Sequence, residues 1–88
     1  MVVLLVDIGN SRIKWARTNG GRFGPRHAAA HLGWGAGEYQ RRLFGKARGR
    51  GARAPEMVLV SSVAAPKVNR RLAAAARLAG ARTRFAKV

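Results

Sequence analysis

The sequence has no cysteine and very few acidic residues. Without cysteine the chain forms no disulfide and offers no thiolate, which is compatible with a reducing compartment. Its three acids are Asp7, Glu38 and Glu56, against 18 lysines and arginines, and the formal net charge is +15. Because Asp7 is the only aspartate, no Ser–His–Asp set can be argued alongside another role for it.

Long hydrophobic runs are also missing. The longest apolar run near the start, "VVLLV", is far short of the ~18 residues that span a bilayer, and no basic segment precedes it as in a signal peptide. The sequence therefore predicts a soluble, cytoplasmic protein without a membrane partner.

The chain is short, at 88 residues, and 48% of them are hydrophobic. This length allows one small domain, or a piece of a larger one, with a modest core. A charge of +15 attracts phosphates of nucleic acid, lipid headgroups or nucleotides. The competing interpretation is compositional bias, because basic residues are scattered over every segment, so charge alone names no partner.

Alternating apolar and turn-forming segments predict an α/β protein of order β-β-β-α-β-α-β. Residues 2–6 are entirely apolar, which is typical of a strand buried on both faces. Asn19 and Gly20 fall in a second predicted turn, where both can adopt positive φ. Pro66 and Gly80 fit the first position and the stop of the last helix. The predicted strands are 2–6, 12–17, 26–31, 57–63 and 82–88, the helices 37–45 and 65–80, and an exposed, mobile loop 46–55.

Asp7 is the most informative residue, because it ends a predicted buried strand just before a glycine. A carboxylate there can hold hydrated Mg²⁺ while turn amides face phosphate oxygens. Asn10 and Ser11 add side-chain donors, and Lys14 adds a point charge for a β- or γ-phosphate. The simpler alternative is that Asp7 only ends the strand by binding turn amides.

"LLVDIGNSRIKWA" resembles the first phosphate motif of type III pantothenate kinases, and "VLVSSVAAPKVNRRL" is similar to a later strand and helix of that family. The resemblance implies the N-terminal part of a ribonuclease H-like, actin-like ATPase domain, with a mixed sheet and an N-terminal β-hairpin. It implies transfer of the γ-phosphoryl group of ATP to pantothenate in the first step of coenzyme A synthesis. It further implies Mg²⁺, a monovalent cation (K⁺ or NH₄⁺) and a homodimer. The residues that would bind the ATP phosphates are Asp7, Ile8, Gly9, Asn10, Ser11, Arg12, Ile13 and Lys14, with Asp7 also at the metal.

The same resemblance places the family's general base, an aspartate in a Gly-x-Asp-Arg segment, beyond residue 88. Glu38 and Glu56 lack that motif context and are expected to be solvated charges. We therefore expect residues 1–88 to be an incomplete N-terminal phosphate-binding subdomain, inactive alone, without the second half of the kinase.

Two other functions fit parts of the sequence. A ribonuclease H-like Holliday-junction resolvase also begins with a strand ending in aspartate, but needs more carboxylates than this chain has. A non-enzymatic module could bind nucleic acid through the basic "GKARGRGARA" segment alone. His27 and His31 are expected at the surface or a sheet edge. Ser61 and Ser62 could contact a substrate or only cap the following helix, and the cap is favoured.

Overall fold

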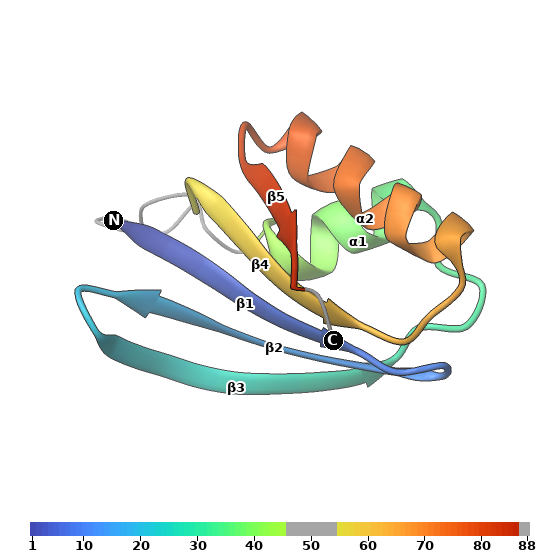
Figure 1. Ribbon diagram of the computed structural model, residues 1–88, viewed down its shortest axis with the longest axis horizontal. Coiled ribbons are helices and arrows are strands. Elements are labelled where there is room, and N and C mark those ends of the chain that lie inside the picture. The colour runs from blue at the N-terminus through green and yellow to red at the C-terminus, as the bar shows by residue number, and fades with distance from the viewer. Residues whose placement is uncertain (46–54, 87–88) are drawn as a thin grey trace.

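The computed structural model describes residues 1–45 and 55–86, and they form a five-stranded mixed sheet with two helices. The strand order is β3-β2-β1-β4-β5. The pairs β1–β4 and β4–β5 are parallel, and the pairs β1–β2 and β2–β3 are antiparallel, so β2 alone runs opposite to the other strands of this sheet. Both helices lie on one side of the sheet (Figure 1). The α/β class, the element order and the N-terminal hairpin are as predicted. The elements are β1 Val2–Ile8, β2 Arg12–Asn19, β3 Arg22–Ala30, α1 Ala36–Leu43, β4 Met57–Ser62, α2 Pro66–Leu78 and β5 Arg82–Phe85.

The central strand β1 is buried on one face only, so the prediction of burial on both faces was wrong. Its alternate residues Leu4, Val6 and Ile8 are buried, whereas Leu5 is half-buried and Asp7 is exposed. The reason is that α1 and α2 cover the same face of the sheet (Figure 1). Successive side chains of a strand point to opposite faces, so every second residue of β1 lies on the face without helices, called here the open face.

The core lies between the sheet and the helices. Apolar side chains of β1, β2 and β4 pack there against one face of each helix. The exposed sides of the helices carry the charges. The fully or nearly fully buried members are Leu4, Val6, Ile8, Ile13, Tyr39, Leu43, Phe44, Val58, Val60, Leu72, Ala75, Ala76 and Ala81.

The second turn is shorter than predicted. Gly20 and Gly21 alone form it, with φ of 59° and 86°, and Asn19 does not take positive φ. β3 begins at Arg22, earlier than expected, and a β-bulge interrupts its pairing between Ala16 and Thr18. Pairing along β2 thus stabilises an alanine-rich edge strand despite the low β-propensity of alanine.

The ends of α2 are only partly as predicted. Pro66 is in the first turn and Gly80 follows the helix with φ of 80°, while the amide of Ala81 donates to the Ala76 carbonyl at 2.9 Å. This is the glycine-dependent C-terminal motif. The N-cap is Ala65, without a side-chain hydrogen bond, so neither Ser61 nor Ser62 caps α2 as predicted.

Replacing Gly80 by Ala should destabilise the fold by about 1–2 kcal/mol, because L-residues disfavour the left-handed conformation by that amount. Gly37→Ala is the matched control. A Cβ at Gly37 meets nothing within 4 Å and the backbone needs no positive φ, so stability should rise by at most about 1 kcal/mol. Urea unfolding followed by circular dichroism measures both; equal changes in the two variants would contradict the C-terminal motif.

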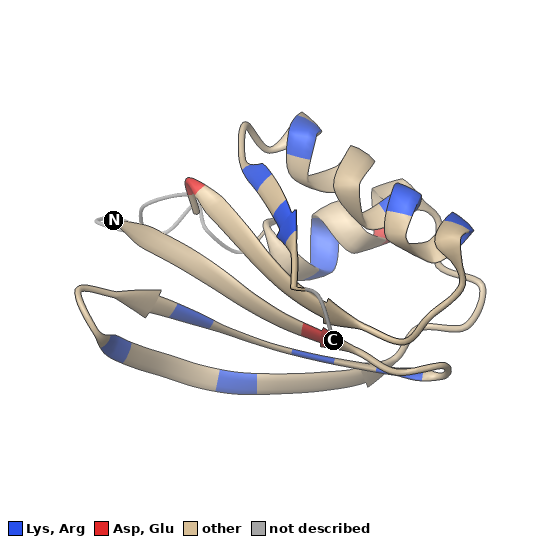
Figure 2. Ribbon diagram, in the orientation of Figure 1, with Lys and Arg blue, Asp and Glu red and all other residues tan. Residues whose placement is uncertain are grey.

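Basic residues are spread over β2, β3, β5 and both helices (Figure 2). The central strands β1 and β4 carry none, and on the face covered by the helices their side chains are buried, where an unpaired charge is costly. The predicted mobile loop at 46–55 lies, except for Pro55, outside the described residues. Within the described part of the chain, neither helix has the length and apolar character needed to cross a membrane.

Candidate functional site

Asp7 lies near the carboxyl end of β1, between two polar neighbours. Its Cα pairs with Lys14 on the antiparallel strand β2 and with Ser61 on the parallel strand β4. All three residues are exposed. Paired residues on neighbouring strands point to the same face with Cβ atoms about 4.5–5.5 Å apart, so the three side chains form one polar row on the open face.

The Asp7 carboxylate makes no ion pair or hydrogen bond with any residue that the structure describes. It therefore does not end β1 by binding turn amides, as the simpler alternative proposed. A carboxylate left free beside a lysine can serve as an anionic metal ligand, while the ammonium group can bind a phosphate oxygen.

The turn after β1, residues 9–11, is held from its inner side. The Gly9 amide donates to the Arg12 carbonyl at 2.8 Å, and a Cβ on Gly9 would lie 3.3 Å from that same oxygen. Glycine thus permits the close approach that shapes the turn. Asn10 and Ser11 are exposed, and within residues 1–45 and 55–86 nothing accepts a hydrogen bond from their amides. Two such amides can donate to an anion.

His31 was expected at the surface and is instead buried, with 3% of its area exposed. Its Nε2 lies 2.9 Å from the Gly9 carbonyl oxygen and its Nδ1 lies 2.7 Å from the Tyr39 hydroxyl. Its own amide donates to the Ser11 carbonyl at 3.0 Å. The prediction failed because β3 carries His31 back to the β1–β2 turn, a contact across 22 residues with no local signal.

The hydrogen bonds of His31 define its neutral form. The Gly9 carbonyl can only accept, so Nε2 carries the proton, and Tyr39 then donates to Nδ1. Trp34 packs against Tyr39 with a ring separation of 5.2 Å and against His31 with 6.3 Å. An aromatic cluster therefore supports the turn from the side of the helices.

Burial raises the pKa of Tyr39, the only tyrosine of the chain. Below the ordinary pKa of a tyrosine, about 10, Tyr39 is neutral in both the folded and the unfolded chain, and its contribution to the free energy of unfolding is complete. It falls as the pH rises toward the higher pKa of the folded state, because the unfolded chain ionises first. Absorbance at 295 nm should therefore show phenolate formation at higher pH in the native protein than in 6 M guanidinium; coincident titrations would contradict the buried hydroxyl.

The open face is hollowed beside Asp7. The hollow has a volume of about 510 Å³, and its floor is formed by β1, β2 and β4. Asp7, Lys14 and Ser61 line one end, and the rest is mostly apolar, with Leu5 and Leu59 among its lining, apart from Arg26 and His27 of β3. A polar end and an apolar floor suit a ligand that carries both a charged and an uncharged part.

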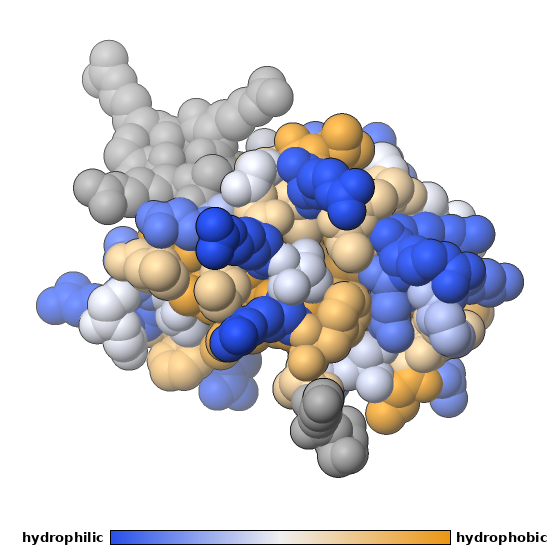
Figure 3. All heavy atoms as spheres, turned by 45° about the horizontal axis from the view of Figure 1, so that its top comes forward, coloured by the Kyte–Doolittle hydropathy of each residue, from blue (hydrophilic) through white to orange (hydrophobic). Residues whose placement is uncertain are grey.

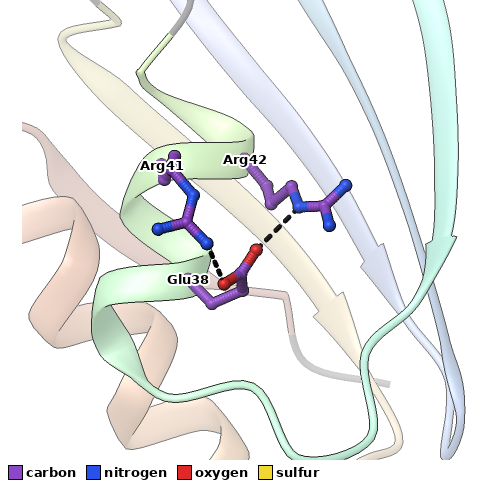
Figure 4. Close-up of polar contacts among 3 residues, drawn as sticks. All are labelled: Glu38, Arg41 and Arg42. Atoms are coloured by element: carbon purple, nitrogen blue, oxygen red, sulfur yellow. Dashed lines mark hydrogen bonds and ion pairs between the residues drawn. The ribbon is translucent and has the colours of Figure 1, made fainter.

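The two other acids are not near this row. Glu38 lies on α1, among the helices, where it pairs with Arg41 and, at 2.7 Å, with Arg42 (Figure 4). The hydrogen bond from Arg42, followed by that from Arg41 and the charges of both, lowers the pKa of Glu38. The Glu56 amide donates to the Val2 carbonyl, so Glu56 lies beside the opposite end of β1 from Asp7. Glu56 is an exposed, solvated charge, as expected, whereas Glu38 is half-buried and paired with two arginines.

The residues present fit one type of metal site. The described residues contain no group of three His, Asp or Glu side chains that could hold a metal. His27 does not join His31, because its ring stacks on that of Trp15, with 5.4 Å between the ring centroids. Mg²⁺ needs only one or two carboxylates when water and substrate phosphates complete its shell. Asp7, exposed beside Lys14, meets that requirement.

A family model described as type III pantothenate kinase matches residues 3–87. The match covers the hairpin, both helices and the last strand. No curated protein matches the chain significantly.

Proposed function

The chain belongs to the type III pantothenate kinase family, and we propose that its β1–β2 hairpin binds the phosphates of Mg·ATP for phosphoryl transfer to pantothenate. The family membership supports a kinase function at the level of the family. The residues and ligands given below belong to the proposal.

One observation carries the proposal: Asp7 pairs with Lys14 just before a turn, and among the described residues neither the Asp7 carboxylate nor the Asn10 and Ser11 amides of that turn have a partner. Asp7 would bind Mg²⁺ directly or through water, which neutralises part of the triphosphate charge. Lys14 and the amides of Asn10 and Ser11 would contact phosphate oxygens, with Arg12 adjacent. Ile8 and Ile13 are buried, so they would hold the hairpin in place rather than touch the nucleotide.

Phosphoryl transfer needs positioning and charge stabilisation more than covalent chemistry. The hairpin supplies the phosphate side of such a site. A base must also accept the proton of the attacking hydroxyl of pantothenate, and neither Glu38 nor Glu56 is near Asp7. We propose that an aspartate outside these 88 residues is this base, so that residues 1–88 act as the N-terminal phosphate-binding subdomain.

Other parts of the proposal rest on the family alone. They are a monovalent cation, K⁺ or NH₄⁺, beside the phosphates, a homodimer as the working assembly, and coenzyme A synthesis in the cytoplasm as its setting. The hollow on the open face would accept part of the bound substrates.

The nucleic-acid functions have less support. A two-metal nuclease needs several clustered carboxylates, and the described residues contain no such cluster. On the face seen in Figure 3, strongly hydrophilic side chains form separate groups divided by apolar and intermediate ones, and not one continuous surface. This distribution favours charges scattered over a solvated surface, although the segment "GKARGRGARA" lies mostly outside the described residues.

Titration of the chain with Mg·ATP, followed by ¹H–¹⁵N NMR, tests the proposal. The amides of residues 9–14 should shift first and saturably. Duplex DNA, titrated at the same ionic strength, is the control for purely electrostatic binding of phosphates, which falls steeply with salt. Shifts confined to the basic helix faces, or shifts caused by DNA alone, would contradict a nucleotide site at the hairpin.

A further inference from the structure

We infer that His31 is a positioning residue, which orients the Asn10 amide of the β1–β2 turn toward a bound phosphate. The inference rests on the proposed function, since it assigns a role within the same site. It concerns a side chain that lies in the core and would not itself touch the nucleotide.

His31 binds two carbonyl oxygens of the turn, those of Gly9 and Ser11, on either side of Asn10. Its Nε2 donates to the Gly9 oxygen at 2.9 Å and its main-chain amide donates to the Ser11 oxygen at 3.0 Å. A third anchor lies just before them, where the Val63 amide donates to the Ile8 oxygen at 3.0 Å. The carbonyls on this side of the hairpin end are thus bound to β3 and to the residue after β4.

Peptide geometry converts this anchoring into a direction for a donor. In a planar trans peptide the carbonyl and the following N–H point in opposite directions. Because the Gly9 oxygen points at buried His31, the N–H of Asn10 in the same peptide unit points away from the core. No described residue accepts from that N–H, so it is free for an exogenous anion.

The imidazole is itself held in the required tautomer. The Gly9 oxygen can only accept, so the neutral ring carries its proton on Nε2, and the Tyr39 hydroxyl, 2.7 Å from Nδ1, then donates to that atom. Tyr39 is 1% exposed and lies on α1 within the core. The chain Tyr39, His31, Gly9 therefore links the packing of α1 to the orientation of a turn amide, and such linked hydrogen bonds strengthen one another.

Two substitutions of His31 distinguish the role of its hydrogen bond to the Gly9 oxygen from the role of the imidazole ring. A glutamine amide reaches about as far as Nε2 and can still donate to Gly9, whereas asparagine reaches only the position of Nδ1. We expect His31→Asn to weaken Mg·ATP binding about fivefold, corresponding to the loss of one oriented hydrogen bond, and to abolish the ATP-induced shift of the Asn10 amide. His31→Gln should retain that shift, and Leu32→Asn, at the adjacent side chain that is 75% exposed, should leave binding unchanged.

The His31 tautomer can also be measured in the unmodified chain, so that this test does not depend on the folding of any variant. In long-range ¹H–¹⁵N spectra of the imidazoles, the neutral form of His31 should be the Nε2–H tautomer, and the Nδ1–H tautomer would overturn the inference. An unchanged Asn10 shift in a folded His31→Asn protein would overturn it as well. If Mg·ATP shifts no hairpin amide in the unmodified chain, the proposed function fails and the role fails with it; if only the His31 variants behave otherwise than expected, the role alone fails.

Discussion

Asp7→Asn should reduce the affinity of the chain for Mg·ATP by at least about tenfold, or about 1.4 kcal/mol. Asn keeps the shape of the side chain but removes the charge that attracts Mg²⁺. Asp7 is exposed and unpaired among the described residues, so the free energy of unfolding should change by no more than about 0.5 kcal/mol. Isothermal calorimetry or NMR titration with Mg·ATP measures the loss.

The same variant should behave differently toward ATP without Mg²⁺. The triphosphate then meets Lys14 and the turn amides without the repulsion of the Asp7 carboxylate, so binding should be unchanged or tighter. Glu56→Gln is the charge-matched control, because Glu56 is exposed beside the other end of β1. Equal losses in Asp7→Asn and Glu56→Gln would show that net charge, and not a metal ligand, governs binding.

The hairpin could be predicted from the sequence because its signals are local. A run of apolar residues ending at Asp7, a glycine that permits close approach, and the alternation around Lys14 all act within a dozen residues. The structure confirms the hairpin and places Asp7 opposite Lys14. The family match confirms the resemblance that the same residues carried. The roles of these residues in binding phosphate stay predictions.

The errors concern features that depend on distant parts of the chain. β1 reads as buried on both faces, yet only the placement of α1 and α2 decides which faces are covered (Figure 1). His31 reads as a surface residue, yet the register of β3 brings it to Gly9. Ser62 follows the pattern of a cap, yet it accepts from the Ala64 amide and donates to Asn69 within α2. Tertiary packing determines each of these, and no local window contains it.

Leu72→Ala should be the most destabilising single change in α2, because Leu72 is fully buried among the sheet residues and α1. Removing a buried leucine side chain costs about 2–5 kcal/mol, since a cavity replaces the lost contacts. Small domains have only about 5–15 kcal/mol to lose, and a net charge of +15 reduces this further through self-repulsion. The melting temperature should therefore fall by at least about 8 °C, since each 1 kcal/mol shifts it by about 4–8 °C in a chain of this size.

Leu78→Ala is the matched control on the same helix, because Leu78 is 67% exposed, and it should change stability by no more than about 0.5 kcal/mol. Thermal unfolding followed by circular dichroism compares the two. The Leu72→Ala variant should weaken Mg·ATP binding only at temperatures near its own, lower melting temperature. The reason is that α2 reaches the candidate site only indirectly, through the 2.7 Å hydrogen bond between the Ser62 hydroxyl and the Asn69 side chain. Similar melting temperatures for both variants would show that α2 does not pack on the sheet through Leu72, and the covered face of β1 would need another explanation.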